Sequence, residues 1–153
     1  MRTRSILPIA VAVAVAAPLL AATPAAAAPH QSGLHFGTIQ YDTPGADRRT
    51  NTAVNGEWVN IHNNSRSTVQ LKGYKVKDNN GYTYTFGSFK LGAGKTVKLR
   101  TGKGGNTSAT RYWGRSWYVW NNTSDKARLI KPNGSLQDSC SWTTRDRGTK
   151  NCH

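Results

Sequence analysis

Apolar and polar residues alternate along several short stretches of the chain, and turn residues separate these stretches at intervals of about ten positions. Val97 and Leu99, for example, lie next to Lys98 and Arg100, which is the period of a strand with one buried face. The stretches expected to form strands are 34–41, 56–63, 69–76, 82–86, 96–100, 116–120 and 126–130, with one more towards Cys140. Helical periodicity is absent after the N-terminal segment, so the pattern predicts an all-β, antiparallel sandwich or barrel of seven to eight strands.

Glycine residues interrupt two of these stretches. The apolar face changes at Gly37 in 34–41 and at Gly73 in 69–76, as in a β-bulge, where one extra residue enters a strand. Residues 78–81, Asp-Asn-Asn-Gly, predict a tight hairpin turn, because Asn-Gly accepts positive φ angles. Between the strands, the polar residues 42–55 are expected to form a long loop, and the Gly-rich residues 101–110 a flexible one.

The segment 111–130 holds three of the five tryptophans and is expected to organise the fold. Residues 116–120 and 126–130 favour two strands, and the Asn/Thr/Ser/Asp residues 121–125 favour the turn of a hairpin. Aromatic rings of this size bury enough apolar area to anchor a small core. The alternative interpretation is that some rings are exposed beside Arg111 and Arg115 and stack on a ligand.

The N-terminal residues 1–28 have the order of a secretory signal peptide. Arg2 and Arg4 precede an apolar run, and four consecutive alanines, 25–28, provide small residues for cleavage after Ala27 or Ala28. A retained membrane anchor is the alternative, although the run is short for a bilayer span. Residues 29–33 are expected to be a flexible lead to a secreted, extracellular domain.

The chain has two cysteines, Cys140 and Cys152, both near the C-terminus. In an exported protein such a pair favours a disulfide over free thiols, and a zinc site would need further ligands. Closing so short a loop stabilises a protein by about 3 kcal/mol in loop-entropy models. A disulfide-closed tail over residues 143–153 is therefore expected.

The formal charge is +14, and it falls to +12 when Arg2 and Arg4 are removed with the signal peptide. An excess of this size favours polyanions such as nucleic acid or an anionic cell-wall polymer, although it also serves solubility. The alternation of three strands sends basic pairs outwards, and Trp113 and Trp117 are possible stacking platforms. The candidate polyanion-binding residues are Lys75, Lys77, Lys98, Arg100, Lys103, Arg111, Arg115, Lys126, Arg128, Trp113 and Trp117.

Catalytic and metal-binding motifs have little support in the sequence. The carboxylates lie mostly beside turn residues, and the chain contains neither a G-x-S-x-G element nor a P-loop. No catalytic residue, metal site or cofactor is therefore expected. One alternative stays open, a small exported hydrolase or nuclease that uses a metal with Asp42, Asp47, Glu57 or His62.

Several motifs, taken in order, resemble one known family. They are Asn-Gly-Glu-Trp-Val-Asn-Ile at 55–61, Leu-Lys-Gly-Tyr at 71–74, Tyr-Trp-Gly at 112–114, Val-Trp-Asn-Asn at 119–122 and Asp-Lys-Ala at 125–127. With this spacing the chain resembles the lamin-tail domain family over about residues 39–142, within an expected domain of residues 34–142, in the form found in exported bacterial proteins. The resemblance implies an immunoglobulin-like β-sandwich that is generally not catalytic. The matching residues, such as Glu57, Trp120 and Asp125, are expected to be structural.

In nuclear lamins this domain is attached to a coiled coil and serves protein and DNA contacts, and in exported bacterial proteins it often accompanies an enzyme. This chain has neither attachment. We therefore expect a monomeric, secreted binding module that contacts a polyanion through a basic face. A protein-interaction domain of the cell surface is a further alternative.

Overall fold

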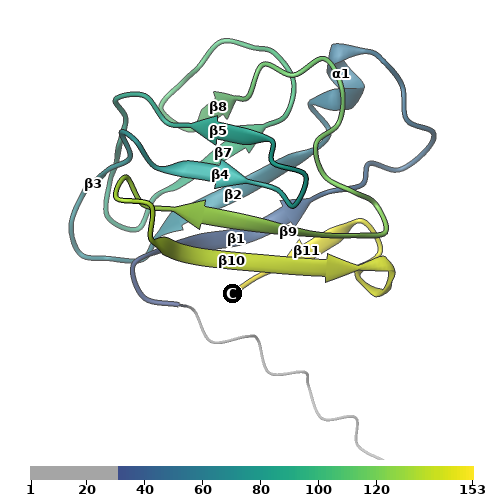
Figure 1. Ribbon diagram of the computed structural model, residues 1–153. Helices are drawn as coiled ribbons and strands as arrows, with labels where there is room; N and C mark the ends of the chain where they lie inside the picture. The colour runs from purple at the N-terminus through teal and green to yellow at the C-terminus, as the bar shows by residue number, and fades with distance from the viewer. Residues whose placement is uncertain (1–30) are drawn as a thin grey trace, which may run out of the picture.

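The computed structural model describes residues 31–153 (Figure 1), so the expected signal peptide and the first residues of the lead lie outside the described part. The chain is mostly strand, as its alternating pattern predicts. Its elements are β1 (Leu34–Gln40), α1 (Asn51–Val54), β2 (Trp58–Asn63), β3 (Val69–Gln70), β4 (Lys75–Lys77), β5 (Thr83–Thr85), β6 (Lys90–Leu91), β7 (Thr96–Arg100), β8 (Thr110–Tyr112), β9 (Ser124–Ile130), β10 (Leu136–Thr143), the 3₁₀ turn η1 (Thr144–Asp146) and β11 (Thr149–Asn151).

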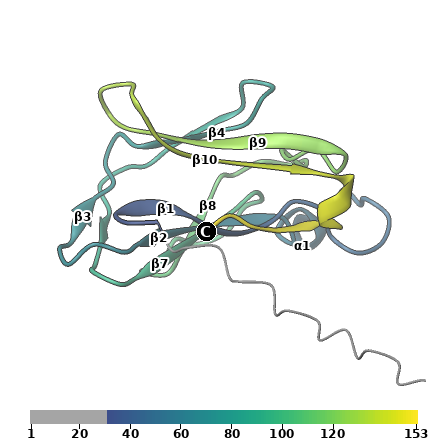
Figure 2. The same cartoon turned by 90° about the horizontal axis from the view of Figure 1, so that it is seen from below.

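Two sheets lie face to face, as Figure 2 shows from below. The first has five strands in the order β11-β1-β2-β7-β8, and the second has four in the order β10-β9-β4-β5. All of their pairs are antiparallel except β7 with β8. A small two-stranded sheet, β3-β6, lies at one end of the sandwich, and α1 lies at the other (Figure 2). The expected all-β sandwich is confirmed.

The core fills the space between the sheets with the alternate residues of each strand. Val59 and Ile61 of β2 and Val97 and Leu99 of β7 are almost fully buried on one side, and Leu129 of β9 is buried on the other. Trp142 stacks on Tyr41 with ring centroids 4.8 Å apart and also meets the edge of Trp120. Large buried rings thus supply much of the apolar area that stabilises the domain.

The two glycine interruptions have different structural consequences. At Gly37 the register of β1 against β2 shifts between Phe36 and Ile39, which confirms the expected irregularity. At Gly73, with φ of +83°, the chain instead leaves one sheet and enters another, so residues 69–76 form β3 and β4 rather than one bulged strand. The prediction of a single strand was wrong, because a β-bulge and a crossing between two sheets both reverse which face of the chain is buried.

The predicted aromatic hairpin is wrong in its first half. Residues 113–123 form no strand, and β9, which begins at Ser124, pairs with β10 and β4 instead. Val119 and Trp120 are adjacent, yet both are buried, whereas neighbouring residues of a regular strand face opposite sides. Residues 113–123 therefore cross one end of the sandwich as a loop with buried side chains. The polar loop expected over 42–55 likewise contains α1, whose N-cap is Thr50.

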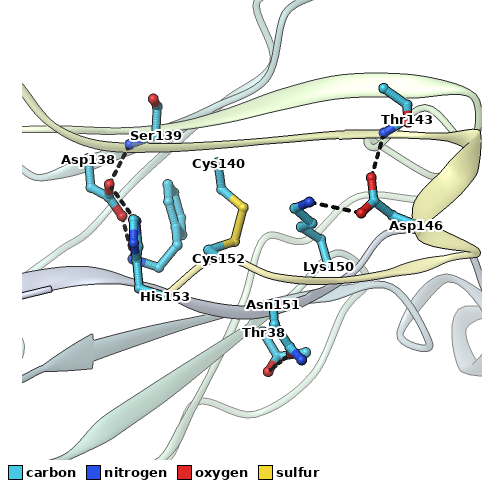
Figure 3. Close-up of a disulfide and its surroundings, with 11 residues drawn as sticks. Thr38, Asp138, Ser139, Cys140, Thr143, Asp146, Lys150, Asn151, Cys152 and His153 are labelled. Atoms are coloured by element: carbon cyan, nitrogen blue, oxygen red, sulfur yellow. Dashed lines mark hydrogen bonds and ion pairs between the residues drawn. A yellow bond between two sulfur atoms is a disulfide. The ribbon is translucent and has the colours of Figure 1, made fainter. Parts of the chain in front are cut away.

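The C-terminal segment is built into the sandwich (Figure 3). Cys140 on β10 and Cys152 after β11 form the expected disulfide, with Cα atoms 5.6 Å apart, and so link the edges of the two sheets. Asp138 accepts hydrogen bonds from the backbone of Phe36 and Ser139 and lies 3.3 Å from the His153 ring. Within residues 31–153, no helix is long and apolar enough to cross a membrane.

Candidate polyanion interface

The three predicted basic pairs do not share one surface. Lys75, Lys77, Lys126 and Arg128 lie on β4 and β9, which are neighbours in the four-stranded sheet. Lys98 and Arg100 lie on β7, in the five-stranded sheet on the other side of the sandwich. Alternation correctly places all six side chains away from the buried positions. Periodicity alone leaves open whether the three pairs share a sheet; the structure divides them between two sheets, so they do not form a single basic face.

Several of these cations already bind parts of the fold. Arg128 donates to the carbonyl of Asp78 at 3.1 Å and to Oδ1 of Asn79 at 2.6 Å, and so supports the turn between β4 and β5. Arg100 donates to the carbonyl of Asn55, next to α1.

Lys98 places its ammonium group 3.9 Å from the ring centroid of Trp58. Burial, and then the nearby Arg100, lower the pKa of Lys98. These cations therefore have structural contacts that a polyanion would have to displace.

Arg111 and Trp113 are also part of the framework. The Arg111 guanidinium lies 4.0 Å from the ring centroid of Phe89, and β8 pairs it with the buried Leu99. Trp113 is half-buried against the core, with its ring 5.8 Å from that of Trp120. The sequence expectation that Trp113 is a stacking platform has no support in this packing.

Lys103 and Arg115 lie elsewhere, next to Asn51 of α1, the helix at one end of the sandwich (Figure 2). Together with Arg49 they line a hollow of about 200 Å³, whose other walls are Asn51 and Ser116. The three cations come from three separate segments, so this cationic hollow exists only in the folded protein.

The backbone around Lys103 is fixed by α1. The Asn51 carboxamide donates to the carbonyl of Lys103 and accepts from its amide, and Asn55 donates to the same carbonyl. Gly102 allows this approach, because a Cβ atom there would lie only 2.5 Å from Oδ1 of Asn55. The short helix thus holds one wall of the cationic hollow in place.

Two exposed aromatic rings lie against cations of the cationic hollow. Trp117 and Tyr82 are each 41% exposed, which is unusual for large apolar side chains in this chain. The Arg49 guanidinium lies 5.0 Å from the centroid of Trp117, and that of Arg115 lies 4.2 Å from the centroid of Tyr82. An exposed ring beside an arginine, as the sequence suggested, is therefore present at Trp117, but the arginine is Arg49 rather than Arg111 or Arg115.

Glu57 fixes the loop that carries Trp117. Its buried carboxylate accepts hydrogen bonds from the amides of Val119 at 2.9 Å and Trp120 at 2.8 Å. Burial raises the pKa of Glu57 to about 8, while the hydroxyl of Thr101 and the two amides act in the opposite direction. Glu57 is therefore a structural group, as the resemblance implies.

The residues of the hydrolase alternative are not brought together as a metal site. Glu57 is bound to backbone amides, His62 lies on β2 with Nδ1 2.8 Å from Oγ1 of Thr96, and Asp42 and Asp47 lie on the loop between β1 and α1. In the described part of the chain, no three His, Cys, Asp or Glu residues are arranged to hold a metal ion. The nearest approach of histidines is the ring contact of His35 with His62 and His153.

Sequence reasoning missed Arg49 and Tyr82. Arg49 lies in the polar loop 42–55, where alternation gives no direction for a side chain. Tyr82 looked like the first alternating residue of a returning strand, although β5 begins only at Thr83. A basic pair, Arg48-Arg49, beside Asp47 was the only available signal, and such pairs are common on solvated loops.

The comparison with known proteins agrees with this framework. No curated protein matches the chain. The model of the Lamin Tail Domain family matches residues 27–144, which is more than half of the sequence and includes Glu57 and the loop that it holds. This family consists of immunoglobulin-like domains that are not enzymes in themselves. The chain therefore belongs to the lamin tail domain family.

Proposed function

We propose that the protein is a secreted, non-enzymatic binding module that holds a polyanion at the loop end of its sandwich. The observation that carries this proposal is the convergence of Arg49, Lys103 and Arg115 on one hollow beside the exposed ring of Trp117. Secretion is supported by the signal-like residues 1–28 and by the disulfide, which suits an oxidising compartment.

Two features favour this end over the sheet faces. The charge of the whole chain attracts any polyanion, so a specific site must differ by geometry rather than by charge alone. Arg49 and Arg115 lie against exposed rings, whereas Arg128 and Arg100 are bound to backbone carbonyls. Guanidinium groups also match the forked geometry of phosphates and carboxylates.

A charge reversal with a matched control tests the proposal. The test variant carries Arg49→Glu, Lys103→Glu and Arg115→Glu. The control carries Lys72→Glu, Lys90→Glu and Lys95→Glu, which are exposed, lie at the β3-β6 end and change the net charge equally. Binding to duplex DNA and to an anionic wall polymer is measured over a salt series. We expect the test variant, but not the control, to lose about three units of the slope of log K against log salt for DNA, since each phosphate contact contributes about 0.9.

Two results would contradict the proposal. If both variants lose the same affinity, the protein is attracted by its overall charge and has no specific site at the loop end. If the unaltered protein binds neither polymer at low salt, it is not a polyanion-binding module. Circular dichroism of each variant shows whether the sandwich is preserved.

A further inference from the structure

A second hollow lies beside Trp117. It measures about 310 Å³, and its lining residues include Asp47, Asn80, Tyr82, Trp117, Asn121 and Asn122. We infer that this hollow, called the amide hollow below, binds a sugar ring of an acidic polysaccharide whose carboxylate reaches the cationic hollow. The inference rests on the proposed function for the anionic part of the ligand, and adds the class of polymer.

The polar groups of the amide hollow match a ligand rich in hydroxyls. Asn80, Asn121 and Asn122 are exposed, and their carboxamides make no hydrogen bond to the rest of residues 31–153. Each carboxamide offers both donors and an acceptor, and Asp47 adds further acceptors. A hydroxyl group donates one hydrogen bond and accepts others, so such a mixed set satisfies it. Phosphate groups accept only, so they would leave the carboxamide oxygens and the Asp47 carboxylate without a donor.

The aromatic groups supply the apolar part of the same site. Trp117 and Tyr82 are exposed to the same extent and both line the amide hollow. A pyranose ring has an apolar C–H face that packs on such rings, and the rings lose little conformational freedom on binding. Arg49 contacts Trp117 and Arg115 contacts Tyr82, so the aromatic walls of the amide hollow lie against two cations of the cationic hollow. A sugar ring in the amide hollow can therefore extend its carboxylate to a guanidinium group of the cationic hollow.

The walls of the amide hollow are held by buried groups before any ligand arrives. The Asp125 carboxylate accepts from the amides of Asn79, Asn121 and Lys126, and so joins the β4–β5 turn to the start of β9. The Trp142 indole donates to the carbonyl of Asn121 at 2.9 Å. A preformed site loses less free energy to ordering when a ligand binds. Its volume is at the small end for ligand pockets, which suits one ring rather than a large molecule.

The test compares polymers that carry equal charge and differ in hydroxyl groups. Binding of the disulfide-bonded protein is measured for an oligogalacturonate, for a polyphosphate with the same number of charges, and for single-stranded oligothymidylate. We expect the oligogalacturonate to bind about tenfold more tightly than the polyphosphate at equal salt, which corresponds to about 1.4 kcal/mol. Trp117→Ala, and separately the pair Asn80→Ala and Asn122→Ala, should remove this difference and leave polyphosphate binding unchanged. Trp117→Tyr keeps an aromatic ring and should retain most of the difference in affinity between the two polymers.

The outcomes separate this inference from the proposed function. Equal affinities for oligogalacturonate and polyphosphate, both lost on reversal of Arg49, Lys103 and Arg115, would overturn the sugar site and leave the polyanion site standing. Tighter binding of oligothymidylate than of either, lost in Trp117→Ala, would overturn it in favour of a nucleobase. No binding of any of the three polymers at low salt would overturn both proposals.

Discussion

Replacing Glu57 by Gln tests whether a buried acid holds the loop end in place. The carboxylate has no exposed surface, and both of its oxygens accept a backbone amide, from Val119 and from Trp120. The carboxamide of Gln offers one acceptor, so one buried amide would face an NH₂ group instead of an oxygen. Leaving a buried donor unsatisfied costs about 1–3 kcal/mol. We therefore expect Glu57→Gln to be less stable than the wild type by about this amount at pH 5.

The difference between the two proteins should depend on pH with a definite sign. The pKa of Glu57 is raised to about 8 from 4.5. A group whose pKa is raised in the folded state contributes its full stability below pH 4.5 and loses it as pH rises towards 8. Over that range the wild type should lose up to about 1.4 kcal/mol of this contribution per pH unit, and Gln loses none. The stability gap should therefore narrow as pH rises, close between about pH 6 and pH 7, and be reversed at pH 8.

Urea unfolding followed by tryptophan fluorescence, from pH 5 to pH 9 with the disulfide intact, measures this gap. Titration of the histidines occurs in both proteins, so it cancels in the difference. Parallel stability profiles from pH 5 to pH 9 would refute the reasoning, because the pKa of Glu57 would then not be raised in the folded protein.

Three further substitutions test the framework, each by urea unfolding against the wild type. Replacing Cys140 and Cys152 by Ala should lower the free energy of unfolding by about 3 kcal/mol, and an unchanged midpoint would mean that the cross-link adds nothing. Asp125→Ala leaves three backbone amides without their acceptor and should cost about 3 kcal/mol or more, so a loss below about 1 kcal/mol would contradict its role. Gly102→Ala should cost about 1–3 kcal/mol through the clash with α1, whereas Gly105→Ala, which meets no atom within 4 Å, should cost little; equal effects would contradict the packing argument.

The sequence predicted features that depend on neighbouring residues. The irregularity at Gly37 and the hairpin turn ending in Gly81 both follow from local backbone preferences, and both are present. The disulfide followed from the count of cysteines, since only one pairing within the chain exists. In these cases a short stretch contains all the information that fixes the structure.

The errors occurred where a distant partner decides the structure. Four of the five residues 116–120 are aromatic or β-branched, so composition alone favours a strand. In the folded protein the amides of Val119 and Trp120 are bound by Glu57, more than sixty residues earlier, instead of by a neighbouring strand. At Gly73 the same change of face fits a bulge or a crossing between sheets, and only the pairing partners of β3 and β4 distinguish them.

The same distinction explains why the candidate site could not be found from charge. A charge reversal of Lys98, Arg100, Lys126 and Arg128, whose side chains alternation sends outwards, would combine residues from opposite sheets. Arg100 and Arg128 hold backbone carbonyls, so their reversal would weaken the fold together with any binding.

By contrast, Arg49, Lys103 and Arg115 come from loops, where no periodicity predicts direction, and the fold brings them to one hollow. The groups that fix these loops come from elsewhere in the sequence: the buried Glu57 holds the Trp117 loop, and Asn51 and Asn55 hold Lys103. Glu57 does not line the cationic hollow, so a related chain can keep this framework residue and change the loop side chains. We therefore expect ligand binding to depend on the loop side chains, and stability on the residues that position them.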